Sequence, residues 1–106
     1  MITEQHLQNY LNHIATRYAE FHNRMGFSGS SANSIERFNE SLRIDEGKAY
    51  YKIIKDGSVH SFIVKQDNKQ FKQGDVLKAA SWKAPAKNFA RGNIISDDLT
   101  NIDWSM

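Results

Sequence analysis

The sequence feature that most restricts the fold of this chain is a change in the spacing of its apolar residues. Between Leu7 and Met25 apolar side chains recur every three or four positions, which places them on one face of an α-helix. From Lys48 onward apolar and polar residues alternate instead, as they do in a half-buried β-strand. A chain of 106 residues is long enough for one domain and too short for two. We therefore expect a single domain, residues 1–106, of the α+β class.

The helical spacing occurs in one long and two short segments. These predicted helices cover residues 1–26, 34–43 and 85–91. Thr3 can cap the start of the first helix, Gly26 can end it, and Pro85 suits the first turn of the last one. The first helix spans about 35 Å, which is longer than a small domain needs. Its apolar stripe is spaced like a short heptad pattern, so a homodimer through this helix is a further hypothesis.

A three-stranded antiparallel β-meander is predicted over residues 48–80, and we expect the long helix to pack on it. Asp56-Gly57 is a typical hairpin turn, which would pair Ile53 with His60. In this register one face of the hairpin is apolar and the other is mixed. The mixed face therefore holds apolar area that is either covered by another segment or offered to a partner.

The charge is distributed unevenly along the chain. The formal net charge is only +2, but residues 48–91 carry nine lysines and Arg91 against three aspartates, a net charge of +7. Residues 1–47 have a net charge of −2, and residues 92–106 form an acidic tail with a net charge of −3. Such a basic region can attract anionic partners. The alternative is a solvated lysine surface that keeps the strands from pairing with other chains.

The residues that usually carry catalysis or bind metals are sparse or badly spaced. Cysteine is absent, which excludes disulfides and thiolate ligands and fits a reducing cytoplasm. His6 and His13 are separated by about 10 Å of helical rise, too far for one metal ion, and His60 is expected in the core. No apolar run approaches the roughly 18 residues of a membrane span. We therefore expect no metal, no cofactor, no enzymatic activity and no membrane partner.

One segment, residues 74–94, combines cations with aromatic residues. Ammonium groups beside an indole ring can recognise an anion and stack on a ligand. With one lysine from the first strand, the candidate partner-binding or anion-binding residues are Lys52, Lys78, Trp82, Lys83, Lys87 and Arg91. The alternative is a structural corner, in which Trp82 fills the core and the cations remain in water.

The same region resembles a known group of proteins. The run GDVLKAASWKAPAKNFARGNI, preceded by GSVHSFIVK, is similar to a segment of small uncharacterised proteins encoded by tailed bacteriophages. The resemblance covers roughly residues 57–95, and the present chain has a longer loop at residues 66–73. It implies a phage origin and action in the cytoplasm of a bacterial host, and it implies no particular reaction.

Two functions follow as hypotheses. The first is a non-enzymatic accessory protein that binds a host or phage macromolecule and blocks or redirects it, as host-takeover and anti-defence proteins do. The alternative is a nucleic-acid-binding accessory protein that uses the basic region 48–91 and loses affinity steeply as salt rises. A small hydrolase or nuclease would need a pair of groups with tuned pKa values, which the sequence does not present.

Overall fold

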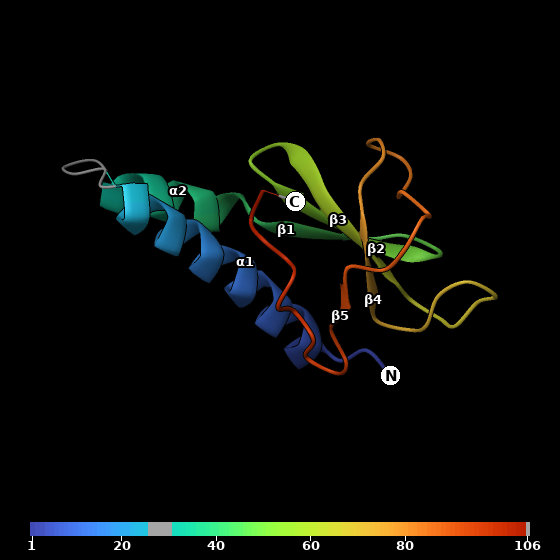
Figure 1. The fold of residues 1–106 in the computed structure, drawn as a ribbon. Coiled ribbons are helices and arrows are strands. Elements are labelled where there is room, and N and C mark those ends of the chain that lie inside the picture. The colour runs from blue at the N-terminus through green and yellow to red at the C-terminus, as the bar shows by residue number, and fades with distance from the viewer. Residues whose placement is uncertain (26–30, 106) are drawn as a thin grey trace.

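The fold is one antiparallel β-sheet with a pair of helices beside it (Figure 1). The computed structural model describes residues 1–25 and 31–105, with side chains for the second helix from Ser34 onward. The helices are α1 (Glu4–Met25) and α2 (Ser31–Ser41). The strands are β1 (Arg43–Glu46), β2 (Tyr50–Lys55), β3 (Ser58–Val64), β4 (Asp75–Lys78) and β5 (Gly92–Asn93). They are ordered β1-β2-β3-β4-β5 with every neighbouring pair antiparallel, so the predicted α+β class is confirmed.

The long N-terminal helix is confirmed, and it starts with the predicted cap. The His6 backbone N–H donates to Thr3 Oγ1 (3.2 Å), and the Thr3 N–H donates to His6 Nδ1 (3.0 Å). This exchange satisfies amide groups that the first turn of a helix leaves unpaired. The predicted stop at Gly26 lies outside the described residues. In Figure 1 α2 runs beside the C-terminal half of α1, and the helix pair extends away from the sheet.

The second predicted helix exists, but the chain changes from helix to strand earlier than expected. The prediction covered residues 34–43, whereas α2 ends at Ser41. There the Ser41 hydroxyl donates to the Phe38 carbonyl (2.6 Å) and accepts the Asp56 N–H (2.9 Å). The edge strand β1 follows directly. The sequence did not predict this strand. Its four residues contain one apolar side chain, Ile44, which is also the one partly buried residue of the strand, and a single apolar residue gives no alternating pattern.

The predicted helix over residues 85–91 is wrong, because this segment pairs with the sheet instead. The Ala86 N–H donates to the Lys78 carbonyl and the Arg91 N–H donates to the Val76 carbonyl, both at 2.7 Å. A free edge of β4 would expose unpaired carbonyls, and the returning chain satisfies them. The predicted three-stranded meander is thus the centre of a five-stranded sheet, extended by β1 on one side and β5 on the other.

The first hairpin turns where predicted, but its register shifts beyond the turn. Asp56 and Gly57 both have positive φ angles (45° and 77°), as a two-residue type I′ turn requires. Further along, β3 contains a β-bulge, and Ile53 pairs with Ser61 instead of His60. Because side chains alternate along a strand, this shift moves every residue after His60 to the face opposite the predicted one.

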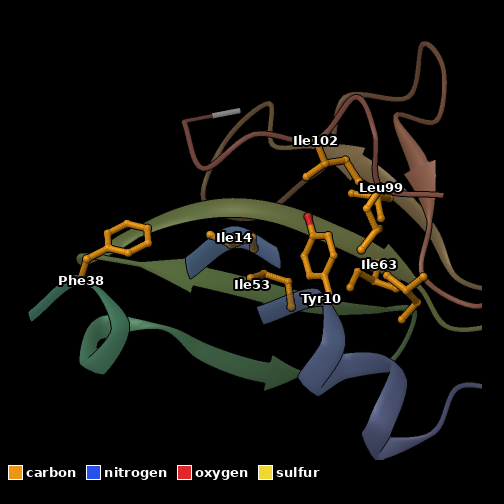
Figure 2. Close-up of a cluster of buried hydrophobic side chains, with 9 residues drawn as sticks. Tyr10, Ile14, Phe38, Ile53, Ile63, Leu99 and Ile102 are labelled. Atoms are coloured by element: carbon orange, nitrogen blue, oxygen red, sulfur yellow. The ribbon is translucent and has the colours of Figure 1, made fainter. Parts of the chain in front are cut away.

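One part of the core lies between the sheet and α1, on what we call the inner face of the sheet. Ile53 and Ile63 of the sheet pack there with Tyr10 and Ile14 of α1 (Figure 2). The tail contributes further buried side chains to the same cluster, namely Ile94, Leu99 and Ile102. The acidic tail is therefore anchored to the protein by its apolar residues.

A second part of the core lies on the opposite, outer face of the sheet. Phe62 and Val64 of β3 and Leu77 of β4 are buried there together with Phe71, which comes from the loop between the two strands. Partly buried residues of the segment after β4, Ala79 and Ala90, pack against this cluster. As a result, β3 is buried on both faces, which is unusual for an antiparallel sheet in a small protein.

A buried hydrogen-bond chain joins α1, the bulge and the tail. His60 Nε2 lies 2.7 Å from the Asp103 carbonyl oxygen, which can only accept, so Nε2 carries the proton. The Ser61 hydroxyl then donates to His60 Nδ1 (2.8 Å), and the Tyr10 hydroxyl donates to Ser61 Oγ (2.7 Å). With the imidazole neutral, each of these buried side chains has a partner.

A substitution of Ile63 can test whether the inner face of the sheet forms the core. Replacing Ile63 by Ala should lower the free energy of unfolding by about 2–5 kcal/mol, because the cavity left between the sheet and α1 cannot close completely. The measurement is urea unfolding followed by circular dichroism. Val59→Ala, a change to a half-buried side chain on the same strand, is the control and should cost clearly less. Equal losses in the two variants would contradict this assignment of the core.

The buried histidine predicts a dependence of stability on pH. Burial lowers the pKa of His60 from 6.5 to about 4; the hydrogen bond to the Asp103 carbonyl opposes this shift, and the charge of Lys55 adds to it. As the pH falls, the imidazole of His60 is protonated in the unfolded chain at a higher pH than in the folded chain. The free energy of unfolding therefore decreases from about pH 6.5 down to about pH 4, by about 3 kcal/mol. Urea unfolding at several pH values measures the loss. The His60→Gln variant lacks this contribution, and an identical pH slope in both proteins would contradict the prediction.

Candidate functional site

The outer face of the sheet carries surface hollows that meet at Tyr50. The register pairs Tyr50 with Val64 and Lys52 with Phe62, so these four side chains lie on the outer face. The Tyr50 ring packs edge-on against Phe62, with 5.7 Å between ring centroids. Three hollows of 290, 240 and 310 Å³ open around this half-buried tyrosine, and Tyr50 lines all three. We call the surface formed by the residues lining these hollows the Tyr50 face.

Lysines from three parts of the chain line the Tyr50 face. They come from the β1–β2 connection with β2, from the loop after β3, and from the segment after β4. They are Lys48, Lys52, Lys65, Lys69, Lys83 and Lys87. The carboxylates that line the same hollows are Asp45, Glu46 and Asp67. Six lysines against three carboxylates give the face a formal net charge of +3.

Five of the six lysines of the face form no ion pair with a described residue. In residues 1–25 and 31–105, Lys65 is the one lysine of the face that forms an ion pair, with Glu46 at 2.7 Å. The carboxylate of Asp67 instead accepts the Gln73 N–H (2.7 Å). Lysines held close together repel one another, so an anion that lies between them is favoured. The Tyr50 face is therefore suited to a negatively charged ligand.

Trp82 stands at the edge of this face. It lies in a tight turn, in which the Ala80 and Ser81 N–H groups both donate to the Ala84 carbonyl (3.0 and 3.1 Å). Its side chain is 49% exposed, so the alternative in which Trp82 fills the core is wrong. Lys52 Nζ lies 4.7 Å from the centre of the indole ring, and this cation–π contact joins Trp82 to the Tyr50 face.

The structure brings four of the six predicted binding residues together and separates the other two. Those that line or touch the Tyr50 face are Lys52, Trp82, Lys83 and Lys87. Lys78 pairs with Ser61, whose hydroxyl faces Tyr10, so Lys78 lies on the inner face. Arg91 lines none of the three hollows, and its guanidinium group lies over the Phe89 ring at 4.2 Å. The even spacing of the cations did not bring all of them together, because the segment is not helical.

Several residues of the face were not predicted from the sequence. Side chains alternate between the two faces of a strand, so Tyr50 and Lys52 lie on one face and Tyr51 lies on the other. This alternation is the one sequence signal that places Tyr50 beside Lys52. Lys65 and Lys69 have no comparable signal, because the loop that carries them folds back over the sheet. The Gln70 side-chain amide of this loop donates to the Lys87 carbonyl (2.5 Å), which ties the loop to the segment after β4. Such a contact between distant segments leaves no pattern in the sequence.

The other surfaces of the described residues have fewer features of a binding site. A hollow of 210 Å³ lies between the helices and the β2–β3 turn, where Arg37 and Asp56 place opposite charges. Across the described part of the chain, no three histidine, aspartate or glutamate side chains are placed to hold a metal ion. None of the described helices is long and apolar enough to cross a membrane. The Tyr50 face is therefore the strongest candidate for a binding site.

The fold and its charged face define a small α+β protein with a lysine-rimmed sheet surface. The chain belongs to a protein family of unknown function, DUF7717, whose model matches residues 2–105. No curated protein and no solved structure matches the sequence. The family match includes both helices, all five strands and every residue of the Tyr50 face. The residues of the face therefore all lie within the span that the family model matches.

The positive potential near Trp82 can be measured with charged quenchers of tryptophan fluorescence. The Trp104→Phe variant leaves Trp82 as the only tryptophan. We expect the ratio of iodide quenching to caesium quenching to be higher for this protein than for free N-acetyltryptophanamide, because the neighbouring lysines concentrate anions. Replacing Lys48 and Lys83 by Gln should reduce the quenching by iodide, while quenching by neutral acrylamide stays nearly constant. A ratio in the Trp104→Phe variant no higher than that of free N-acetyltryptophanamide would show that the potential is absent.

Proposed function

We propose that this chain is a non-enzymatic binding protein that holds nucleic acid on the Tyr50 face. The observation that carries the proposal is the set of six lysines around Tyr50, of which Lys65 alone is ion-paired among the described residues. A nucleic acid presents closely spaced phosphates, and each contact between a phosphate and a lysine releases counterions. Half-exposed aromatic rings among the lysines add surfaces for the bases.

The spread of the lysines favours a polymer over a small anion. The lysines line three adjoining hollows and do not converge on one point. A single small anion could contact only the lysines of one hollow, and the others would stay unpaired. A chain of phosphates can follow the face from Lys83 past Tyr50 to Lys87 and use lysines from all three hollows.

Two features of the sequence favoured a protein partner, namely the long first helix and the apolar area on the mixed face of the hairpin. In the structure both features form contacts within the protein. The distal half of α1 packs against α2 and the tail, where the Tyr18 ring stacks on Phe38 (3.9 Å between centroids) and meets Trp104 edge-on (4.9 Å). The apolar residues of the outer face are buried under Phe71 and the segment after β4. Of the large apolar side chains described in these two regions, Met25, Trp82 and Phe89 remain exposed. Five of the six lysines of the Tyr50 face form no ion pair within the described residues, which favours a polyanion. The homodimer through α1 stays a prediction.

The resemblance of residues 57–95 to proteins of tailed bacteriophages supplies the setting for this proposal. It favours a phage-encoded accessory protein in the cytoplasm of a bacterial host, where phage and host nucleic acids are both present. The resembling segment includes β3, β4 and the turn that carries Trp82, so it overlaps with the Tyr50 face. Binding of a host or phage protein is the alternative function.

Neutralising two lysines of the face should weaken binding of nucleic acid. We expect the Lys52→Gln, Lys83→Gln double variant to bind labelled oligonucleotides of about 20 nucleotides at least about tenfold more weakly at low salt. The slope of the logarithm of the association constant against the logarithm of salt concentration should become smaller by about 1.5, because two phosphate contacts are lost. Fluorescence anisotropy at several salt concentrations measures both quantities.

The matched control changes the same charge elsewhere. Lys72 and Lys78 line none of the three hollows, so the Lys72→Gln, Lys78→Gln double variant should retain most of the affinity and most of the salt slope. Comparable losses in the two double variants would indicate binding through net charge alone. That result would contradict a site on the Tyr50 face.

A further inference from the structure

We infer that the nucleic acid bound by the Tyr50 face is single-stranded, and that one of its unpaired bases stacks on Trp82. This inference rests on the proposed function and names the class of ligand. It is carried by the exposed Trp82 ring on its hydrogen-bonded turn, by the arrangement of the lysines around aromatic residues, and by a second pair of an aromatic ring and a cation at Phe89.

Backbone hydrogen bonds close the turn that carries Trp82 before any ligand binds. Two hydrogen bonds to the Ala84 carbonyl close its turn, and an isolated bridge between Ala79 and Pro85 ties the base of the turn together. Lys52 Nζ lies over the indole ring, and about half of the side-chain surface remains in water. The indole therefore has free area for the flat face of a base. Because the backbone of this turn is closed before binding, stacking of a base has to order only the side chain of Trp82, which lowers the entropic cost.

A double helix does not suit this arrangement. Its bases stack on one another and show only their edges in the grooves, so a side-chain ring reaches the face of a base only after the stack is opened. On this protein the lysines lie on several sides of Tyr50 and beside Trp82. A single strand can place its phosphates at such lysines while its bases turn toward the rings between them.

A second pair of the same kind lies on the same segment of the chain. The Arg91 guanidinium group is 4.2 Å from the centre of the Phe89 ring, and the Phe89 side chain is 56% exposed. A single exposed aromatic residue is common on protein surfaces. Trp82 and Phe89 both lie within residues 79–91 and each has a cation over its ring, which is the combination of aromatic and basic side chains that single-strand-binding surfaces use. Arg91 and Phe89 line none of the three hollows, so this second pair lies outside the Tyr50 face, on the segment that carries Trp82.

Tryptophan fluorescence can test the stacking directly, because the chain has two tryptophans. The probes are an oligothymidylate of about 20 nucleotides, which forms no duplex with itself, and a DNA duplex of the same length. In the Trp104→Phe variant, oligothymidylate should quench the emission of Trp82. In the Trp82→Phe variant, the emission of Trp104 should stay nearly unchanged, although oligothymidylate still binds. The duplex should bind more weakly than oligothymidylate and should not quench Trp82.

Affinity supplies the second measurement. Trp82→Ala should weaken binding of oligothymidylate about tenfold and leave duplex binding nearly unchanged, whereas Trp82→Phe should retain most of the affinity. Because Trp82 is exposed, we expect both variants to unfold at the wild-type temperature. The Trp82→Phe variant keeps an aromatic ring, and its fluorescence and affinity remain informative if the alanine variant fails to fold.

The outcomes separate this inference from the proposed function. Duplex binding at least as tight as that of oligothymidylate, with no quenching of Trp82, would overturn the inference and leave the proposed function standing. Absence of binding to either nucleic acid at low salt would overturn both. Displacement of oligothymidylate by polyglutamate at equal charge concentration would show a site for any acidic polymer, including an acidic protein, and would also overturn the inference.

Discussion

The rest of the structure depends on the β-bulge in β3 and on the buried hydrogen bonds that hold it. The extra residue, His60, shifts the pairing of the hairpin so that the side chains of His60 and Ser61 lie within 2.8 Å of each other on the inner face. The Tyr10 hydroxyl and the Asp103 carbonyl complete their hydrogen bonds. The first helix, the sheet and the tail therefore meet at one buried point. A buried polar group left there without a partner would cost roughly 1–3 kcal/mol. A different register of the hairpin would break these hydrogen bonds, so this cost favours the observed register over the alternatives.

The same bulge creates the surface that we propose as the binding site. After the shift, Phe62 and Val64 lie on the outer face, where they need a cover from water. The loop after β3 and the segment after β4 supply that cover, and these two segments also carry four of the six lysines of the Tyr50 face. The acidic tail is anchored in the inner core, so its aspartates line none of the three hollows. The carboxylates of the tail are thus kept away from the lysines of the Tyr50 face, and the repulsion among these lysines is left for a ligand to relieve.

The candidate site could be predicted only in part from the sequence. The basic region and the closeness of Trp82 to cations could be predicted because charge and residue type are visible without a structure, whereas whether Trp82 is exposed or fills the core was left open. Lys78 and Arg91 were grouped with them because a helix over residues 85–91 would have brought the cations together, and that helix does not form. Tyr50, the residue shared by all three hollows, was overlooked because its role depends on loops that are distant in the sequence.

Local spacing determined those features that depend on neighbours in the chain. These are the long helix with its cap at Thr3, the turn at Asp56-Gly57, the mixed class of the fold and the concentration of positive charge. Only the tertiary structure decided which face each residue after His60 occupies, that β1 and β5 join the sheet, and that residues 85–91 pair with β4. The physical reason is that a turn or a helix is stabilised by contacts within a few residues. A bulge or an edge strand is stabilised by hydrogen bonds and burial against segments far away in the sequence, and these leave no periodic pattern behind.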